Sequence, residues 1–147
     1  MSDIILRDAT SADMDKILKL QIAVFAGEQR IPAEGVPLSP ALNPHWWCAE
    51  LDGKIAAAVA AWQEDGLTHW GRFAVQPHLR GQHIGTALAR RSVEDLFSEG
   101  VDAIYLTARE STVHIFCNMG GVITGEPEPF FEGTVTPVIL RKENYVN

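Results

Sequence analysis

The chain has 147 residues, of which 46% are apolar, and both values suit a single globular domain over residues 1–147 with one substantial core. The formal net charge of −7 at pH 7, with no basic run longer than Arg90-Arg91, argues against nucleic acid or an anionic membrane as a partner. The N-terminus lacks a leader pattern and no window approaches the roughly 20 apolar residues that span a bilayer, so we expect a cytoplasmic protein.

The first 44 residues predict a strand, an amphipathic helix and a loop. Residues 4–6 form a short apolar run typical of a strand, and Thr10 with Asp13 has the spacing of a capping box at a helix start. Apolar residues then recur every three or four positions as far as Phe25, which predicts one helix with a single apolar face. Four prolines between residues 31 and 44 favour a loop with a short helical turn.

Two Asp-Gly pairs mark hairpins in the middle of the chain. Asp52-Gly53 and Asp65-Gly66 supply the positive φ angles that tight hairpin turns need. The apolar segments beside them are therefore predicted as three successive antiparallel strands, at 46–51, 55–62 and 67–75. Because neighbours on a strand face opposite ways, at most one of Trp46 and Trp47 could line an acceptor pocket, and the other is expected in the core.

The remainder of the chain alternates helices with strands. Residues 85–99 place apolar side chains at helical spacing and are followed by Gly100, which suits a C-terminal cap. The elements predicted after it are a strand at 103–108, a short helix at 112–119 and strands at 122–123 and 135–140, the last two separated by a turn-rich segment. This order of elements predicts an α/β fold with a mixed sheet.

The segment before the second helix carries the strongest functional signal. A strand ending at Val75 runs through a proline turn into Arg80-Gly81-Gln82-His83-Ile84-Gly85 and then into the helix. The first amides of a helix have no internal acceptors and lie at the positive end of its dipole, so they can hold an anion such as phosphate. Gly81 and Gly85 let the main chain approach that anion closely, although a tight turn before an ordinary helix also explains them.

These residues carry a family resemblance. Val75-x4-Arg80-Gly81-x2-Ile84-Gly85-x2-Leu88 resembles the acyl-CoA-binding motif of the GCN5-related N-acetyltransferases (GNAT), and residues 116–122 are similar to that family's Phe-Tyr-x-x-x-Gly-Phe. Together with segments 24–32 and 71–75, they are similar to the ElaA/YjcF-like branch. The resemblance implies a mixed, mostly antiparallel sheet of about six to seven strands flanked by about four helices, with acetyl-CoA as co-substrate.

The resemblance also implies which residues hold the cofactor. The main chain of the strand pairs with the pantetheine arm, and the amides of the following turn bind the pyrophosphate. The residues that it implies for cofactor binding are Phe73, Ala74, Val75, Arg80, Gly81, Gln82, His83, Ile84, Gly85, Thr86 and Phe116. His83 stands where the family pattern has its first glycine, and its amide can still donate if its backbone stays in the helical region.

In this family an amine attacks the thioester directly, which requires a base for the amine proton and an acid for the leaving thiolate. By the same resemblance Cys117 stands in place of the family's general-acid tyrosine, and we favour water over the thiol as the acid. The candidate bases are Glu28, His69, Glu110 and His114. Each also has a plainer interpretation as a solvated surface residue or a core-edge residue.

The sequence does not identify the acceptor amine, and small amines, amino sugars, peptide N-termini and lysine side chains are all compatible with it. A non-catalytic acyl-CoA-binding or sensor module is the alternative function, favoured by the missing tyrosine. Cys48 and Cys117 are expected as buried free thiols, and the five histidines lack zinc-site spacing, so no metal is expected. A homodimer stays open beside a monomer.

Overall fold

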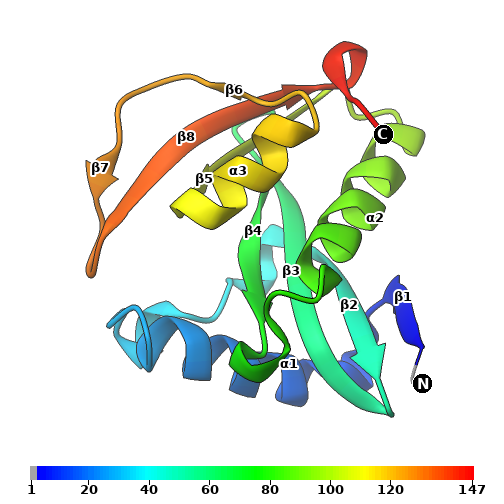
Figure 1. The fold of residues 1–147 in the computed structure, drawn as a ribbon, viewed down its shortest axis with the longest axis vertical. Helices are drawn as coiled ribbons and strands as arrows, with labels where there is room; N and C mark the ends of the chain where they lie inside the picture. Colours follow the sequence, from blue (N-terminus) through cyan, green and yellow to red (C-terminus); the bar gives the residue numbers. More distant parts are fainter. Residues whose placement is uncertain (1–2) are drawn as a thin grey trace.

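The computed structural model describes residues 3–147 as one eight-stranded sheet with helices on both faces (Figure 1). The strand order is β1-β2-β3-β4-β5-β8-β6, and β7 pairs with β8. The strands are β1 Ile4–Asp8, β2 His45–Leu51, β3 Lys54–Glu64, β4 Leu67–Val75, β5 Ala103–Ala108, β6 Val122–Ile123, β7 Glu128–Pro129 and β8 Thr134–Arg141. The α-helices are α1 Met14–Gln21, α2 Ile84–Ser98 and α3 Glu110–Asn118.

The expected α/β architecture with a mostly antiparallel sheet is confirmed. All strand pairs are antiparallel except β4 with β5. The described residues hold three α-helices where about four were expected, because the proline-rich segment forms only the 3-10 turns Ala33–Gly35 and Pro40–Leu42. The sheet has one strand more than expected, and the two-residue β7 lies in the segment predicted as turns.

Both predicted hairpins are present, and their turns have the backbone that the Asp-Gly pairs indicated. Asp52 and Gly53 join β2 to β3 with φ angles of 54° and 76°, and Asp65 and Gly66 join β3 to β4 with 55° and 77°. Two successive positive φ angles match the right-handed twist of the flanking strands. These turns set the register of the three strands in which the site is built.

The first helix ends earlier than the apolar periodicity predicted. After Gln21 the chain continues as one π-helical turn, Ile22–Ala26, in which the Gly27 amide donates to the Ile22 carbonyl (3.1 Å). Apolar spacing at three and four residues does not distinguish an α-turn from a π-turn. The wider turn changes the direction in which the following residues leave the helix, and such turns are frequent at functional sites.

The capping box at the start of this helix is confirmed. Asp13 Oδ2 accepts a hydrogen bond from the Thr10 amide (2.7 Å), and both Asp13 oxygens accept from the Arg7 guanidinium (2.8 and 3.0 Å). Nη2 of Arg7, one of the two nitrogens bound to Asp13, also donates to Glu50 (2.9 Å), which ties β1 and β2 to the helix start. The Arg7 guanidinium and the Thr10 amide hold the pKa of Asp13 well below its usual range.

We predict that Asp13→Ala lowers the free energy of unfolding by about 1–2 kcal/mol at pH 7, because it removes a cap and an ion pair. A carboxyl whose pKa is lowered by folding contributes its full stabilisation above its unfolded pKa of about 3.9. This contribution is lost progressively as the pH falls from there through the lower pKa of the folded state. Urea unfolding at about pH 7 and about pH 2.5 should therefore show the difference from wild type shrinking at the lower pH. An equal difference at both values would exclude the ionised carboxylate as its source.

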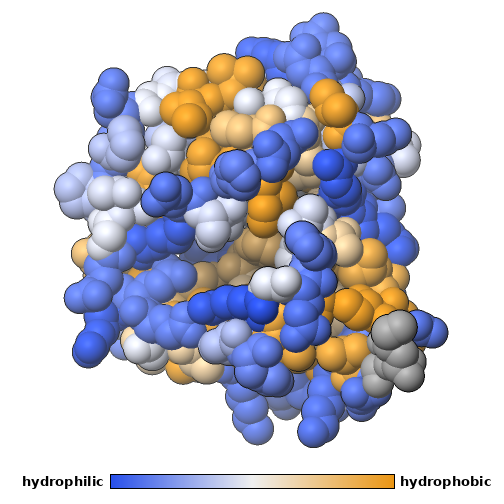
Figure 2. All heavy atoms as spheres, viewed as in Figure 1, coloured by the Kyte–Doolittle hydropathy of each residue, from blue (hydrophilic) through white to orange (hydrophobic). Residues whose placement is uncertain are grey.

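The parallel pair in the centre of the sheet is short. β4 and β5 pair only at Thr68–Ile104 and His69–Tyr105, after which β4 stays with β3 and β5 stays with β8. The two strands therefore diverge, and the open side of the wedge lies between β4 and α3 (Figure 1). On this face the molecule is hollowed, with apolar residues on the floor and hydrophilic ones around the rim (Figure 2).

A β-bulge adds to this divergence. Val59 of β3 lies opposite two residues of β4, Arg72 and Phe73, and Arg72 has a φ of 57°. The Arg72 carbonyl, turned out of the ladder, accepts a hydrogen bond from the buried Gln21 side chain. Bulges re-aim side chains beside functional sites, and this one turns Arg72 out of the regular alternation.

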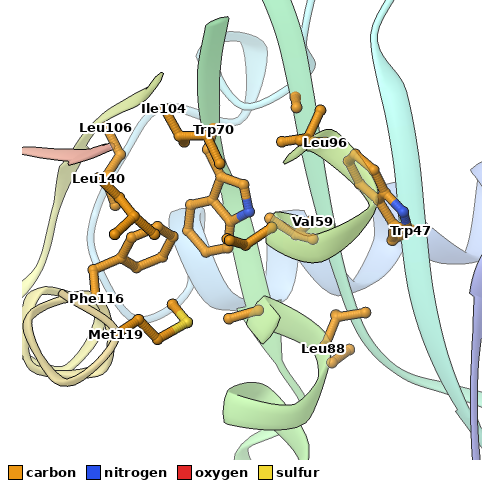
Figure 3. Close-up of a cluster of buried hydrophobic side chains, with 14 of the residues drawn as sticks. Trp47, Val59, Trp70, Leu88, Leu96, Ile104, Leu106, Phe116, Met119 and Leu140 are labelled. Atoms are coloured by element: carbon orange, nitrogen blue, oxygen red, sulfur yellow. The ribbon is translucent and has the colours of Figure 1, made fainter. Parts of the chain in front are cut away.

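Two apolar cores cover the two faces of the sheet. The larger core packs α2 and α3 against the sheet and centres on Trp47, Trp70 and Phe116 (Figure 3). The polar edges of both tryptophans are satisfied, since Trp47 Nε1 donates to Asp95 and Trp70 Nε1 to Ser92, each at 2.9 Å. The smaller core packs α1 on the opposite face, where the half-buried Trp46 contacts it. The expected alternation of the two neighbouring tryptophans is therefore confirmed.

Candidate functional site

A cavity of about 920 Å³ fills the wedge between β4 and β5. Its walls come from the segment 24–36, the second half of β4, the turn 79–86, the end of β5, the first turns of α3 and residues 130, 131 and 135. The floor is apolar, whereas several arginines and carboxylates lie along the walls. A cavity of this size and mixed lining suits a small organic ligand.

The turn from β4 to α2 presents unused amides to this cavity. Within the described residues the first backbone hydrogen bond into α2 comes from Ala87 to the His83 carbonyl (3.0 Å), and the amides of residues 81–86 have no acceptor. Gly81, with a φ of 84°, bends the chain before the helix. This arrangement can bind an anionic group with main-chain donors at the positive end of the helix.

His83 takes a glycine-like conformation at the position where the resemblance has glycine. It is the N-cap of α2 with φ 64° and ψ 13°, in the left-handed region and not the right-handed helical one. Left-handed backbone costs a non-glycine residue roughly 1–2 kcal/mol. The turn therefore keeps the path that a glycine would give it, and His83 still lines the cavity.

Gly85 allows α2 to approach β4 closely. A Cβ at this position would lie 2.9 Å from Phe73 Cζ and 3.1 Å from Val75 Cγ2, both closer than ordinary contact. The helix start and the strand edge therefore share one wall of the cavity. Of the eleven residues implied for cofactor binding, nine line the cavity, while Gln82 and Phe116 do not. Phe116 is fully buried, with its ring 4.6 Å from the Trp70 ring between centroids.

The four candidate bases are not brought together. Glu28 lines the cavity and accepts a hydrogen bond from Arg80 (2.8 Å), so the segment after α1 contacts the turn before α2. His69 lies where β4 still pairs with β5 and stacks on Trp62, and it is outside the lining. The exposed residues Glu110 and His114 of α3 are likewise outside the lining.

The prediction that both cysteines are buried is wrong for one of them. Cys48 is buried between β1 and β3, and burial raises the pKa of its thiol to about 11. Cys117 is exposed near the end of α3 and does not line the cavity. Helical periodicity is the reason, because the neighbouring Phe116 occupies the core-facing position.

We therefore predict that Cys117→Ala leaves kcat within about threefold of the wild-type value, since the thiol lies outside the cavity. Steady-state kinetics with acetyl-CoA and an accepted amine would measure this effect. A loss of about a hundredfold in a folded variant with normal CoA affinity would instead make the thiol a participant in proton transfer.

Two arginines of the cavity wall were missed by sequence analysis. Arg72 donates from Nε to the Val36 carbonyl (2.8 Å), and burial lowers its pKa. Arg109 donates to Gln29 (3.0 Å) and to the Glu132 carbonyl (2.5 Å), with its guanidinium over the Phe130 ring. A single arginine in a strand and another before a helix form no motif. The positions of both depend on the bulge and on the divergence of β4 from β5.

Two further findings concern the described residues as a whole. No helix in residues 3–147 is long and apolar enough to cross a membrane. Over the same range, no three side chains of His, Cys, Asp or Glu lie close enough together to form a candidate metal site.

Several proteins of known structure share the fold of this chain. Escherichia coli ElaA has a similar structure (TM-score 0.79, 19% identity), over 95% of this chain and 99% of that one. An acyl-CoA N-acyltransferase from Pseudomonas aeruginosa is similar over the same shares (TM-score 0.75, 19% identity). A ribosomal-protein-alanine N-acetyltransferase from Brucella melitensis is similar over 93% of this chain and 99% of that one (TM-score 0.75, 14% identity).

The sequence itself gives the family. No curated protein sequence matches the chain significantly. The sequence profile described as the Acetyltransferase (GNAT) family matches residues 15–117, which include most of α1, the hairpins, the amide-rich turn and most of α3. This match covers well over half of the chain, and the structural neighbours have the same fold. The chain therefore belongs to the GNAT family of acetyltransferases.

Proposed function

We propose that this protein is an N-acetyltransferase that transfers the acetyl group of acetyl-CoA to a primary amine by direct attack. The observation that carries the proposal is the row of unpaired amides at residues 81–86, in a turn that, except for Gln82, lines the cavity between the diverging strands. Family membership supports acetyl transfer in general. The anion-binding turn supports a cofactor with a pyrophosphate.

The cofactor lies along β4 in this proposal. Its pyrophosphate accepts hydrogen bonds from the amides of the turn, with Arg80 adding positive charge. The edge of β4 at residues 73–75 faces the side that β5 has left, so its main-chain groups are free to pair with the amides of the pantetheine arm. The thioester then reaches the part of the cavity near the bulge, beyond Phe73.

Glu28 is the base that we propose. The amine nitrogen attacks the thioester carbonyl, a C–N bond forms and the C–S bond breaks, while Glu28 takes the proton from the amine. Water protonates the leaving CoA thiolate, because no tyrosine or cysteine is among the lining residues that the structure describes. In the structure the Glu28 carboxylate is paired with Arg80, and this ion pair has to open for the carboxylate to reach an amine at the thioester.

The decisive experiment is amine-dependent release of thiol from acetyl-CoA across a panel of amines. Turnover with at least one class of amine supports the enzyme. The alternative is a non-catalytic acyl-CoA sensor, for which the missing tyrosine is the supporting observation. Tight CoA binding in a calorimeter, with no amine in the panel increasing thiol release, would favour the sensor.

A further inference from the structure

The charged residues that line the cavity are more often positive than negative, although the chain as a whole is acidic. The chain has a formal net charge of −7, yet three arginines and two glutamates line the cavity. Arg80 is paired with Glu28. Among residues 3–147, no carboxylate lies within 4 Å of Arg72 or Arg109. Two arginines are therefore left without a counter-ion inside an acidic protein.

The burial of these arginines makes the missing counter-ion costly. Nη2 of Arg109 is buried and has no hydrogen-bond partner within the described part of the chain. A buried donor without an acceptor destabilises the protein, and more so when it is charged. The side chain of Arg72 is desolvated, and its one hydrogen bond in the described residues goes to a neutral carbonyl. Both arginines line the cavity, so an anionic ligand held there would supply the counter-ion that the described residues lack.

The cofactor phosphates are not placed to be that ligand. β4 runs toward the turn that binds anions, so Arg72 lies three residues before Val75, about 10 Å along the strand from the strand's end. Arg109 follows β5 on the opposite wall and contacts the β7–β8 turn through Glu132. Both arginines thus lie toward the thioester and acceptor end of the cavity.

Apolar side chains line the cavity together with these arginines. Phe25, Ile31 and Pro32 come from the segment after α1, and Phe130 and Phe131 come from the β7–β8 turn, where the Phe130 ring lies against Arg109. The two phenylalanines are exposed hydrophobic residues whose rings meet edge to face. Exposed aromatic side chains at a cavity mouth offer contact area to an apolar ligand group.

We propose that the acceptor is an amine that also bears a carboxylate and an apolar side chain, as in a free apolar amino acid, with the carboxylate bound by Arg72 and Arg109. This inference rests on the proposed acetyl transfer. A carboxylate has acceptors for both guanidinium groups, and its binding leaves the amine of the same molecule to reach the thioester. The two phenylalanines cover the side chain.

The test compares matched acceptors and matched variants. Phenylalanine, phenylalaninamide and 2-phenylethylamine share the ring and the amine, and only the first has a carboxylate. We expect kcat/KM to be at least about tenfold higher for phenylalanine, and Arg72→Gln or Arg109→Gln to abolish this preference by raising KM. The affinity for CoA should stay within about twofold. Arg30→Gln, an exposed residue outside the lining, is the control for an equal change in net charge.

A second readout separates this inference from the proposed catalysis. Calorimetry on the protein saturated with CoA measures binding of N-acetylphenylalanine and of its amide, which requires no turnover. Preferential binding of the acid that both arginine variants lose supports the carboxylate site even if no transfer occurs. The proposed carboxylate site is overturned if N-acetylphenylalanine and its amide bind equally well. It is also overturned if the Arg72→Gln variant still binds the acid more tightly than the amide. Arg72→Gln is the main variant, because Arg109 also holds the β7–β8 turn.

Discussion

Gly81→Val is expected to raise the dissociation constant for CoA at least about tenfold, or about 1.4 kcal/mol. Gly81 has a φ of 84°, a conformation that a β-branched residue adopts only with strain. Nothing lies within 4 Å of a Cβ built there, so backbone strain and not a clash rotates the neighbouring amides. The proposed pyrophosphate site depends on their direction. Calorimetry with CoA measures the effect.

The matched control is Gly53→Val, at another glycine with positive φ and open space around its Cβ. It tests strain of the same kind in the β2–β3 hairpin, so both variants should lose similar stability while only Gly81→Val loses CoA affinity. Arg80→Ala should cost less affinity than Gly81→Val, because main-chain donors dominate the site. If a folded Gly81→Val protein bound CoA as tightly as the wild type, the pyrophosphate site could not be in this turn.

Glu28→Gln should lower kcat about a hundredfold and leave the affinity for CoA within about threefold. Glutamine keeps the shape of the side chain and can still accept the hydrogen bond from Arg80, but it cannot take the proton of the attacking amine. The loss should therefore appear in kcat, measured by thiol release at saturating amine.

Glu34→Gln is the control for this experiment, since Glu34 is the other carboxylate of the lining and has no ion pair among the described residues. We expect its kcat to stay within about threefold of wild type. If the Glu28→Gln enzyme keeps a third or more of the wild-type kcat, the amine proton is taken by water or by another group and not by Glu28.

Local signals predicted much of this structure. The two Asp-Gly hairpins and the capping box at Thr10 involve residues adjacent or nearly adjacent in the chain, and short-range backbone preferences determine them. The start of α2 follows from its apolar spacing and was predicted to within one residue. The amide-rich turn was found for the same reason, because it is one continuous segment.

Features that depend on contacts between distant segments were not predicted. The bulge at Arg72 comes from the register of β3 against β4 and from the side chain of Gln21, about 50 residues away in the chain. The burial of Phe116, and with it the exposure of Cys117, depends on how α3 packs against Trp70. The ion pair of Glu28 with Arg80 joins two segments that no local pattern relates.

The short parallel pairing between β4 and β5 has an evolutionary consequence. Beyond His69 and Tyr105 no ladder hydrogen bond fixes how far apart these strands lie, so the width of the wedge depends on the side chains that fill it. Substitutions there can widen or narrow the space for an acceptor without breaking sheet pairing. Descendants of such a chain can therefore exchange one acceptor for another by a few replacements on the wedge walls, while the hairpins and the turn before α2 stay unchanged.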